Sequence, residues 1–345
     1  MDIKKKVPNI QENISLANYT TFKIGGPSKY FFIAEDEKKI KKAVSAAREL
    51  NLKYFILGGG SNILISDKGF DGVVIKVESR KLKVESRKLE SKTIYADAGT
   101  NLGTLVKFSV DNNLTGMEWA IGIPGTLGGA IRGNAGAFNY SISDFIKTVE
   151  VLDAQEEKNK KLKISTCGGS AEGGKVQNHN SKLKTFKNKD CGFKYRNSIF
   201  KRNKNLIILA AEIRLEKGDS EISEKKIQEY LQKRKSVQPL EYPSVGSIFK
   251  NILFSKVSSK TFKKCPQIEQ FRQAGKIPAG WLIENAGLKG KKIGGAQISE
   301  KHSNFIINTG NASAEDVVIL ISLIKQKIRN KFDLQLMEEI EYAGF

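Results

Sequence analysis

Cysteine and histidine are scarce in this sequence of 345 residues, which contains three cysteines and two histidines. Cys167, Cys191 and Cys265 lie far apart and form no Cys-x-x-Cys pair, which argues against a disulfide framework and a zinc site. His179 and His302 are too few for a metal cluster, so we expect no bound metal. Sparse, unpaired cysteines are typical of a reducing compartment, and we expect the protein in the cytoplasm.

Long apolar runs are also missing. No run of about eighteen apolar residues exists, so the sequence predicts no membrane span. The charged segment 1–16 lacks the apolar core of a secretory signal. Acidic residues are outnumbered by lysine and arginine, 37 against 58, which leaves a net charge of +21. Because the lysines are spread over the whole sequence, we interpret them as general surface charge and expect no nucleic-acid, membrane or obligate protein partner.

What is present is a mixed order of helical and strand patterns, which indicates an α+β protein with more than one domain. Apolar residues at helical spacing predict helices at 35–50, 101–112, 223–235 and 313–332, the last opened by a Ser-Ala-Glu-Asp cap. Runs rich in β-branched and aromatic residues predict strands at 30–33, 54–57, 149–152, 206–215 and 304–308, and a further strand pair at 72–77 and 93–98.

Three stretches interrupt this order. KVESRKL occurs twice in tandem, at Lys76–Leu82 and Lys83–Leu89, and its charge predicts a hairpin extension that projects into solvent. Residues 155–190 are polar and rich in lysine, which predicts a loop or insertion. Residues 251–276 are irregular and basic.

Two glycine-rich segments predict a nucleotide-like ligand. At 57–62 a strand ends in three glycines, whose N–H groups can face an anion, although an ordinary tight turn has the same sequence. It is not a Rossmann fingerprint, because Ile63-Leu64-Ile65 continues as a strand instead of opening a helix. The second segment, 122–137, is stiffened by Pro124. Two such loops in one domain favour a nucleotide cofactor over simple close packing.

The order of three motifs is that of a known family. TFKIGGP at Thr21–Pro27, GGGSN at Gly58–Asn62 and GIPGTLGG at Gly122–Gly129 resemble the UDP-N-acetylenolpyruvoylglucosamine reductases, the MurB family. That family belongs to the FAD-binding superfamily typified by vanillyl-alcohol oxidase and p-cresol methylhydroxylase. The resemblance implies a two-subdomain module that holds the FAD pyrophosphate in these loops. The FAD-binding residues it implies are Gly58, Gly59, Gly60, Ser61, Asn62, Pro124, Gly125, Thr126, Gly128, Gly129 and Asn134.

Further motifs of the same family imply three catalytic residues, Arg196, Ser247 and Glu339. The segment 193–200 resembles F-x-Y-R-x-S-x-F, and the guanidinium of Arg196 suits a carboxylate that gains charge. Ser247 aligns with a serine that donates a proton, which requires a strongly basic carbon as acceptor. Glu339 aligns with the glutamate of an L-x-P-E-V tail, with Glu338 replacing the proline. Local sequence alone fits ordinary roles equally well: a surface arginine for Arg196, a serine in a turn for Ser247, and a solvated acid for Glu339.

The segments 279–290 and 299–308 resemble the family's substrate-binding domain. The substrate contacts that the resemblance implies are Tyr195, Asn251, His302 and Asn304. His302 fits a structural histidine equally well. The insertion at 251–276 follows the serine motif directly, so we expect it at the substrate channel. The short tail after Glu339 predicts the shorter subclass of the family, which lacks an extra tyrosine-bearing loop.

The resemblance extends from Thr20 to Gly344 and predicts three regions. Residues 14–76 form the first FAD-binding subdomain, and 77–217 form the second, with inserts at 76–90 and 155–190 and a return of the chain at 333–345. Residues 218–332 form an α+β substrate-binding domain with the insert 251–276.

The activity that the resemblance implies is UDP-N-acetylmuramate dehydrogenase. Such an enzyme converts UDP-N-acetylglucosamine enolpyruvate to UDP-N-acetylmuramate, with bound FAD and NADPH as co-substrate. Two alternatives stay open. One is another FAD-dependent oxidoreductase of the same superfamily, and the other is a non-enzymatic binder of nucleotide or nucleic acid, which only the net charge favours.

Overall fold

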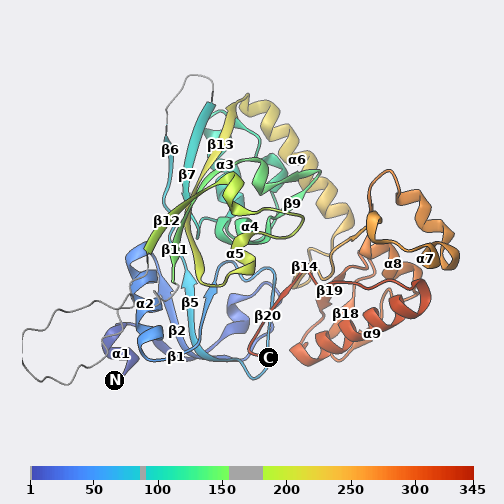
Figure 1. Cartoon of the computed structure of the whole chain (residues 1–345), viewed down its shortest axis with the longest axis horizontal. Helices are drawn as coiled ribbons and strands as arrows, with labels where there is room; N and C mark the ends of the chain where they lie inside the picture. The colour runs from blue at the N-terminus through green and yellow to red at the C-terminus, as the bar shows by residue number, and fades with distance from the viewer. Residues whose placement is uncertain (1, 86–90, 155–181) are drawn as a thin grey trace, which may run out of the picture.

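The computed structural model describes residues 2–85, 91–154 and 182–345. Its first part is a four-stranded sheet with the order β1 (Gln11–Ser15), β2 (Pro27–Ala34), β5 (Phe70–Val77), β3 (Tyr54–Leu57) (Figure 1). Strands β2, β5 and β3 are parallel, and β1 is antiparallel to β2. The predicted first helix is confirmed as α2 (Glu37–Glu49), which begins at Asp36 because the Asp36 carboxylate accepts a hydrogen bond from the Lys39 amide.

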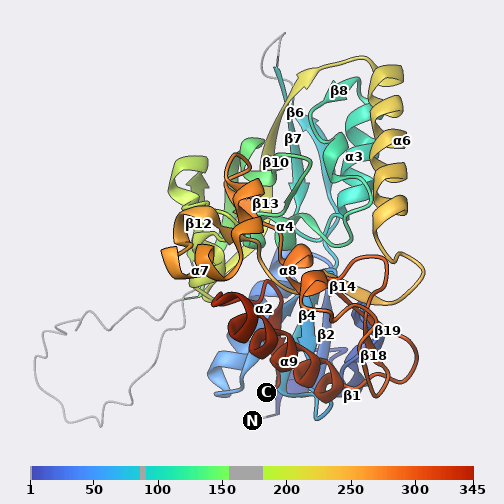
Figure 2. The same cartoon turned by 90° about the vertical axis from the view of Figure 1, so that its right-hand side faces the viewer.

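The second part is an antiparallel sheet. Its strand order is β12 (Lys182–Lys187), β11 (Ile146–Asp153), β13 (Leu206–Lys217), β7 (Ser91–Asp97), β6 (Leu82–Glu85), and β8 (Leu114–Thr115) also pairs with β13. Helices α3 (Leu102–Asp111), α4 (Leu127–Gly133) and α6 (Ser220–Val237) lie beside it, and α6 leads towards the C-terminal part (Figure 2). One hydrophobic cluster joins this sheet to the first, because buried residues of β2, α2 and β5 pack with those of β7, β11 and β13.

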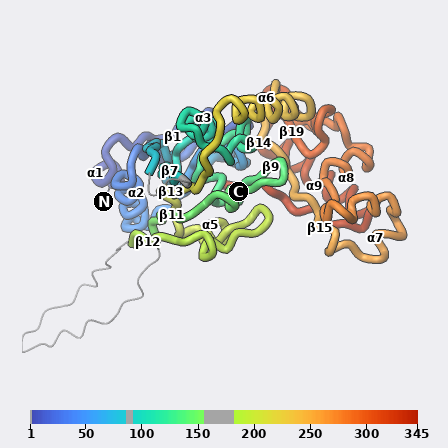
Figure 3. Tube along the Cα trace, turned by 90° about the horizontal axis from the view of Figure 1, so that it is seen from above, coloured from blue at the N-terminus to red at the C-terminus, as the bar shows by residue number. Residues whose placement is uncertain are grey.

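The third part is built around a second hydrophobic cluster, which also includes Phe22, Ile24 and Leu64 of the first part. It contains the sheet β14 (Ser244–Ser247), β19 (Phe305–Asn308), β18 (Ala296–Ile298), β17 (Lys292–Ile293), with helices α7 (Ser259–Lys264), α8 (Ala279–Asn285) and α9 (Ala314–Phe332). The cap predicted for the last helix is confirmed, since Ser313 and Asp316 form a capping box. Seen from above, this part lies at one end of the molecule (Figure 3).

The chain then returns to the first part. Strand β20 (Glu341–Ala343) runs parallel to β4 (Ile63–Ile65), the strand that follows the first glycine loop. The remaining short elements are α1 (Ile3–Lys6), β9 (Gly136–Ala137), β10 (Tyr140–Ser141), α5 (Ile199–Arg202), β15 (Ile252–Leu253) and β16 (Lys276–Ile277). The domain boundaries proposed above stay a prediction. None of the described helices combines the length and apolar character needed to cross a bilayer.

The described part of the tandem repeat contributes to both sheets. The predicted hairpin is confirmed, because β6, which lies mainly in the second copy, pairs antiparallel with β7, but the first copy begins inside β5 and does not project into solvent there. Lys76 and the buried Val77 of the first copy end β5, while Leu82–Glu85 form β6. Residues 86–90 lie outside the described residues. The predicted strands at 72–77 and 93–98 exist as β5 and β7, but they lie in different sheets and do not pair with each other.

The other two interruptions also contain ordered segments. Residues 155–181 lie outside the described residues, but Lys182–Lys187 form the edge strand β12, which pairs with β11. Side chains of this strand are mostly exposed, and because an edge strand is held by main-chain hydrogen bonds, no apolar pattern revealed it. The stretch 251–276 is closed by the pairing of β15 with β16 and buries Cys265 and Ile268 in the C-terminal core.

Candidate active site

A cleft of about 380 Å³ lies where the three parts meet. The first two parts contribute the glycine loops and several charged side chains, and the third contributes the end of β14 and the tail before β20. Its lining includes 55–63, 122–126, 129–130, 132–133, 135–137, Arg196, Lys201, Arg234, Gln238, Leu240, 244–247, Phe305, Glu339 and Glu341. Within the described chain, the insertion 251–276 contributes no residue to this lining, but Asn251 and Lys276 at its two ends contact Tyr195 beside the cleft, and its place at the substrate channel stays a prediction.

The two glycine loops touch each other through their backbones. A Cβ atom on Gly59 would lie 2.5 Å from Cα of Gly125, and one on Gly125 would lie 2.6 Å from Oγ of Ser61. The Ser61 hydroxyl donates to the Pro124 carbonyl at 2.9 Å. Glycine is therefore required at both positions, and the contact leaves a wall of exposed main chain along the cleft.

This wall suits a phosphorylated cofactor. Arg234 lines the cleft with only 7% of its surface exposed, and its Nε has no hydrogen-bond partner in the described part of the chain. One terminal nitrogen donates to the Trp119 carbonyl at 3.3 Å. A guanidinium buried in this way is costly unless an anion pairs with it. The donor set and the close-packed glycines thus fit a dinucleotide such as FAD.

The predicted cofactor residues divide into two groups. Those that line the cleft are Gly58, Gly59, Gly60, Ser61, Asn62, Pro124, Gly125, Thr126 and Gly129. Gly128 and Asn134 do not belong to the lining. A Cβ on Gly128 would lie 2.9 Å from Cβ of Ala98, so this glycine allows α4 to pack closely.

Asn134 uses its side chain within the protein, and its role as a cofactor contact stays a prediction. It ends α4 in the left-handed conformation and is buried. Its amide donates to the Lys194 carbonyl at 3.1 Å and accepts from the Ser143 amide at 3.2 Å. Asn134 therefore holds the segment that carries Arg196.

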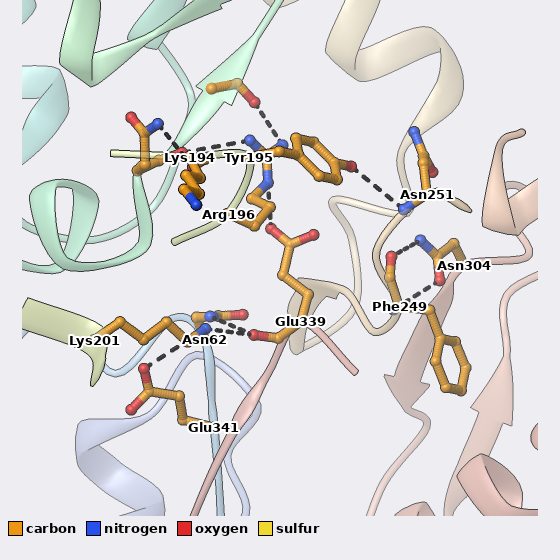
Figure 4. Close-up of polar contacts among 12 residues, drawn as sticks. Asn62, Lys194, Tyr195, Arg196, Lys201, Phe249, Asn251, Asn304, Glu339 and Glu341 are labelled. Carbon is orange, nitrogen blue, oxygen red and sulfur yellow. Dashed lines mark hydrogen bonds and ion pairs between the residues drawn. The ribbon is translucent and has the colours of Figure 1, made fainter. Parts of the chain in front are cut away.

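Arg196 and Glu339, which are 143 residues apart, form an ion pair in the cleft (Figure 4). Nε of Arg196 lies 2.6 Å from Oε1 of Glu339, and another guanidinium nitrogen donates to the Gly136 carbonyl at 2.8 Å. Burial raises the pKa of the Glu339 carboxyl, although Arg196, Lys201 and Lys250 act in the opposite direction. The pair is thus a partly desolvated carboxylate clamped by a planar cation.

Ser247 lies at the end of β14, next to an irregularity in the pairing of β14 with β19. The pairing register shifts between Ser244 and Ser247, and Gly246 has a φ of +76° in this interval. Such a bulge redirects a side chain from the regular face of a sheet. Ser247 and Glu339 both line the cleft, so the structure brings together the three predicted catalytic residues.

Main-chain hydrogen bonds join the serine segment to the glutamate segment. The Glu339 amide donates to the Ile248 carbonyl at 2.8 Å, and the Lys250 amide donates to the Met337 carbonyl at 2.9 Å. Neither bond uses the amide of residue 338. A proline at this position, as in the L-x-P-E-V tail, would therefore allow the same two hydrogen bonds. Glu338 itself turns to α9, where its carboxylate lies 2.8 Å from Nζ of Lys325.

Asn304 is buried and clamps the main chain of Phe249 (Figure 4). Its side-chain oxygen accepts from the Phe249 amide at 3.0 Å, and its side-chain nitrogen donates to the Phe249 carbonyl at 2.8 Å. His302 lies half-buried beside Phe305, and its Nδ1 accepts from the Asn304 amide at 3.2 Å. Burial lowers the pKa of His302. Neither residue belongs to the cleft lining, and both support the serine segment instead.

Tyr195 and Asn251 meet at the edge of the site. The Tyr195 hydroxyl accepts from the Asn251 amide at 3.3 Å, and the Asn251 side chain accepts from the amide of Ala279 at 3.1 Å. Nζ of Lys276 lies 4.2 Å from the centre of the Tyr195 ring. The predicted substrate contacts Tyr195 and Asn251 thus form one cluster next to Arg196.

Four charged residues of the cleft were missed by the sequence analysis: Arg132, Lys201, Arg234 and Glu341. Glu341 follows Glu339 by two residues, which in a strand places both side chains on one face. That spacing was the one available signal. The pairing of Glu341 with Arg132, 209 residues away, has no counterpart in local sequence.

Comparisons with known proteins cover almost the whole chain. Residues 28–158 match the FAD binding domain family, and residues 238–343 match the C-terminal domain of UDP-N-acetylenolpyruvoylglucosamine reductase. The reductase of this name from Caldanaerobacter subterraneus subsp. tengcongensis is 40% identical over 332 residues, covering 96% of this chain and 93% of that protein. The chain belongs to the UDP-N-acetylenolpyruvoylglucosamine reductase family.

Other members of this reductase family agree. The reductase from Clostridium novyi is 35% identical over 350 residues, covering 100% of this chain and 97% of that protein. The crystal structure of MurB from Thermus caldophilus superposes with a TM-score of 0.70 at 27% identity, covering 97% of this chain and 99% of that chain. The predicted fold class, an FAD-binding module with a C-terminal domain of the MurB family, is confirmed.

Proposed function

We propose that this chain reduces the enolpyruvyl group of UDP-N-acetylglucosamine enolpyruvate at the expense of NADPH and yields UDP-N-acetylmuramate, a peptidoglycan precursor. One observation carries the proposal: Arg196, Glu339 and Ser247 line one cleft together with the glycine loops. The full-length relationship to the reductase family supports the substrate and the use of FAD and NADPH.

The protein's contribution is to hold the substrate and control a proton. The glycine loops and the buried Arg234 would hold FAD, which when bound would supply hydride transfer between NADPH and the terminal vinyl carbon. We assign to Arg196 the substrate carboxylate, because one guanidinium can hold two oxygens in a plane. Charge accumulates on this carboxylate when the double bond is reduced, so a fixed cation there stabilises the enol intermediate.

We assign proton donation to Ser247. Its hydroxyl donates the proton to the carbon next to the carboxylate, which is strongly basic at that stage. The serine alkoxide then regains a proton from solvent. Glu339 orients Arg196 through the 2.6 Å contact and, as a neighbouring acid with a raised pKa, stabilises the enol.

Tyr195 and Asn251 are proposed to contact the substrate at the edge of the cleft, where the Lys276 ammonium adds positive charge. A UDP-sugar carries a diphosphate, so a cation is expected beside it. The described cysteines, Cys191 and Cys265, are free thiols, which supports action in the cytoplasm.

The test separates the two half-reactions. NADPH reduces the purified flavoprotein without oxygen, the enolpyruvyl UDP-sugar is added, and return of the oxidised flavin absorbance is followed. We expect rapid return in the wild type and a loss of about 10²–10⁴-fold in Ser247→Ala. Ser236→Ala, which changes an exposed serine on α6, is the control and keeps the wild-type rate. A wild-type flavin that stays reduced in the presence of this substrate contradicts the proposed function.

A further inference from the structure

A second carboxylate, Glu341, lies in the cleft next to the catalytic pair and has no place in the proposed chemistry. It opens β20 two residues after Glu339. The guanidinium of Arg132 holds both of its oxygens, with Nε 3.2 Å from Oε1 and a terminal nitrogen 3.1 Å from Oε2. Two parallel contacts of this kind fix the orientation of a carboxylate.

Arg132 is itself tied to the segment that carries Arg196. Another of its guanidinium nitrogens donates to the Phe200 carbonyl, and its own carbonyl accepts from the Ser198 hydroxyl at 2.7 Å. Glu341 is therefore attached, through one arginine, to the chain between Arg196 and Lys201.

Lys201 connects this carboxylate to Glu339 (Figure 4). Its Nζ lies 3.7 Å from Oε1 of Glu341 and 3.2 Å from the main-chain carbonyl of Glu339. The side-chain amide of Asn62 donates to the same carbonyl at 3.2 Å. Two donors thus fix the peptide that carries the catalytic carboxylate, and one of them depends on Glu341 for its counter-charge.

We propose that Glu341 is a positioning residue of this reductase: it holds Lys201 and Arg132 in place so that Lys201 fixes the backbone of Glu339 and leaves its carboxylate to Arg196. Without the charge of Glu341, Arg132 and Lys201 face each other in a half-buried space. Of the two acids that act on Lys201, Glu341 and Glu339, the carboxylate of Glu339 then remains. Lys201 would compete with Arg196 for it, and the catalytic pair would lose its geometry.

The charges around Lys201 predict that loss of the Glu341 charge changes how the activity depends on pH. Burial lowers the pKa of Lys201 below its ordinary value, and Lys250 after the serine segment and Arg132 on α4 act in the same direction, whereas Glu341 and Glu339 on the tail raise this pKa. Loss of the Glu341 charge therefore lowers the pKa of Lys201 further. The alkaline limb of the activity profile, where Lys201 loses its proton, is expected to move to lower pH.

The inference rests on the proposed function, and the experiment compares two neighbouring acids. Glu341→Gln removes one charge in the cleft, and Glu338→Gln removes one three residues earlier, outside the cleft lining, where Glu338 faces Lys325 on α9. We expect Glu341→Gln to slow flavin reoxidation by the enolpyruvyl substrate at least tenfold, with unchanged KM, FAD content and rate of flavin reduction by NADPH. Glu338→Gln should match the wild type within twofold.

A crystal structure of Glu341→Gln gives a readout independent of activity. We expect the 2.6 Å contact between Arg196 and Glu339 to be broken while the surrounding backbone is retained. If Glu341→Gln reoxidises its flavin at the wild-type rate and keeps this contact, the inference is overturned and the proposed function is unaffected. Equal slowing of both half-reactions with loss of FAD assigns Glu341 a merely structural role and also overturns it. A wild-type enzyme that ignores the substrate contradicts the proposed function instead.

Discussion

Arg196 adopts a backbone conformation that arginine rarely has. Its φ is +52°, in the left-handed region, where a residue with a Cβ costs about 1–2 kcal/mol. The conformation is held from outside, since the side chain contacts Glu339, Gly136 and Asn134. Strain that the surroundings maintain at a cleft is typical of residues that a reaction requires in one orientation.

Replacing Arg196 by lysine tests whether this orientation matters beyond charge. An ammonium carries the same charge but has a single nitrogen, so it cannot serve Glu339, Gly136 and a substrate carboxylate together. We expect Arg196→Lys to lower kcat by about 10²–10³-fold with unchanged FAD content, measured by steady-state kinetics. Arg202→Lys, at an exposed arginine contact to Gly192, is the matched control. Similar kcat values for the two variants would show that charge alone suffices.

At the scale of elements, the bulge of β14 determines where Ser247 points. Gly246 has a φ of +76°, and a Cβ added there would meet no protein atom within 4 Å. The requirement for glycine is therefore conformational and not steric. A regular strand at this position would direct Ser247 to another side of the sheet.

Two substitutions at Gly246 separate these causes. Alanine and asparagine both add a Cβ, but asparagine tolerates a positive φ better. We expect Gly246→Ala to lose about 1–2 kcal/mol of unfolding free energy and to slow flavin reoxidation. Gly246→Asn should lose less unfolding free energy and slow reoxidation less. Urea unfolding and the reoxidation assay give the two values. An asparagine variant as impaired as alanine would indicate that any side chain here obstructs the cleft.

Elements were predictable where one segment determines them. The helix at Glu37–Glu49 has its own apolar face and cap, and Ser313 caps the last helix through a neighbour three residues away. The tandem repeat shows the limit of such prediction. Lys76 in the first copy donates to the Gly58 carbonyl at 2.8 Å, whereas Lys83, the same position of the second copy, is exposed. Identical heptads thus take different roles because their tertiary neighbours differ.

At the scale of the whole molecule, a buried acid fastens α6 to the cofactor-binding part. Both oxygens of Glu118 are used: one accepts from Thr115 and Ser223 at 2.6 Å each, and the other accepts from the Gly116 amide at 2.8 Å. Burial by itself would raise the pKa of Glu118, but these hydrogen bonds together lower it below its ordinary value. Because α6 leads to the C-terminal part, this contact anchors the connection between the two (Figure 2).

Replacing Glu118 by glutamine should weaken the fold in a way that depends on pH. The glutamine oxygen can still accept from the Gly116 amide, but its NH2 group then stands where Oε1 accepts from the Thr115 and Ser223 hydroxyls, at a cost of about 1–3 kcal/mol at pH 7. A carboxyl with a lowered pKa stabilises the fold above its ordinary value of 4.5, and this contribution disappears as the pH falls through the lowered pKa. Urea unfolding should therefore show a difference in unfolding free energy between the wild type and Glu118→Gln that becomes smaller at acidic pH. The exposed Glu224→Gln is the control, and a difference independent of pH would contradict the assignment.

The candidate site was predictable only where a motif carried it. Arg196, Ser247 and Glu339 followed from resemblance, and the structure brings them to one cleft. Asn304 and Asn134 were interpreted as ligand contacts because a buried amide and a binding amide have the same sequence signal. Glu341 and Arg132 were missed because their pairing depends on how β20 returns to β4, which no local pattern encodes.

The pairing of β20 with β4 also has a consequence for the order of events during translation. Strand β4 and the glycine loops leave the ribosome early, but Glu341, which pairs with Ile63 of β4, follows 278 positions later. A growing chain can therefore assemble its cofactor-binding sheets, since domains generally fold in order of synthesis. It still lacks Glu339 and Glu341 at that stage. The ability to bind the cofactor is thus expected to precede the ability to turn over substrate. We expect a nascent chain to be inactive until β20 has been synthesised.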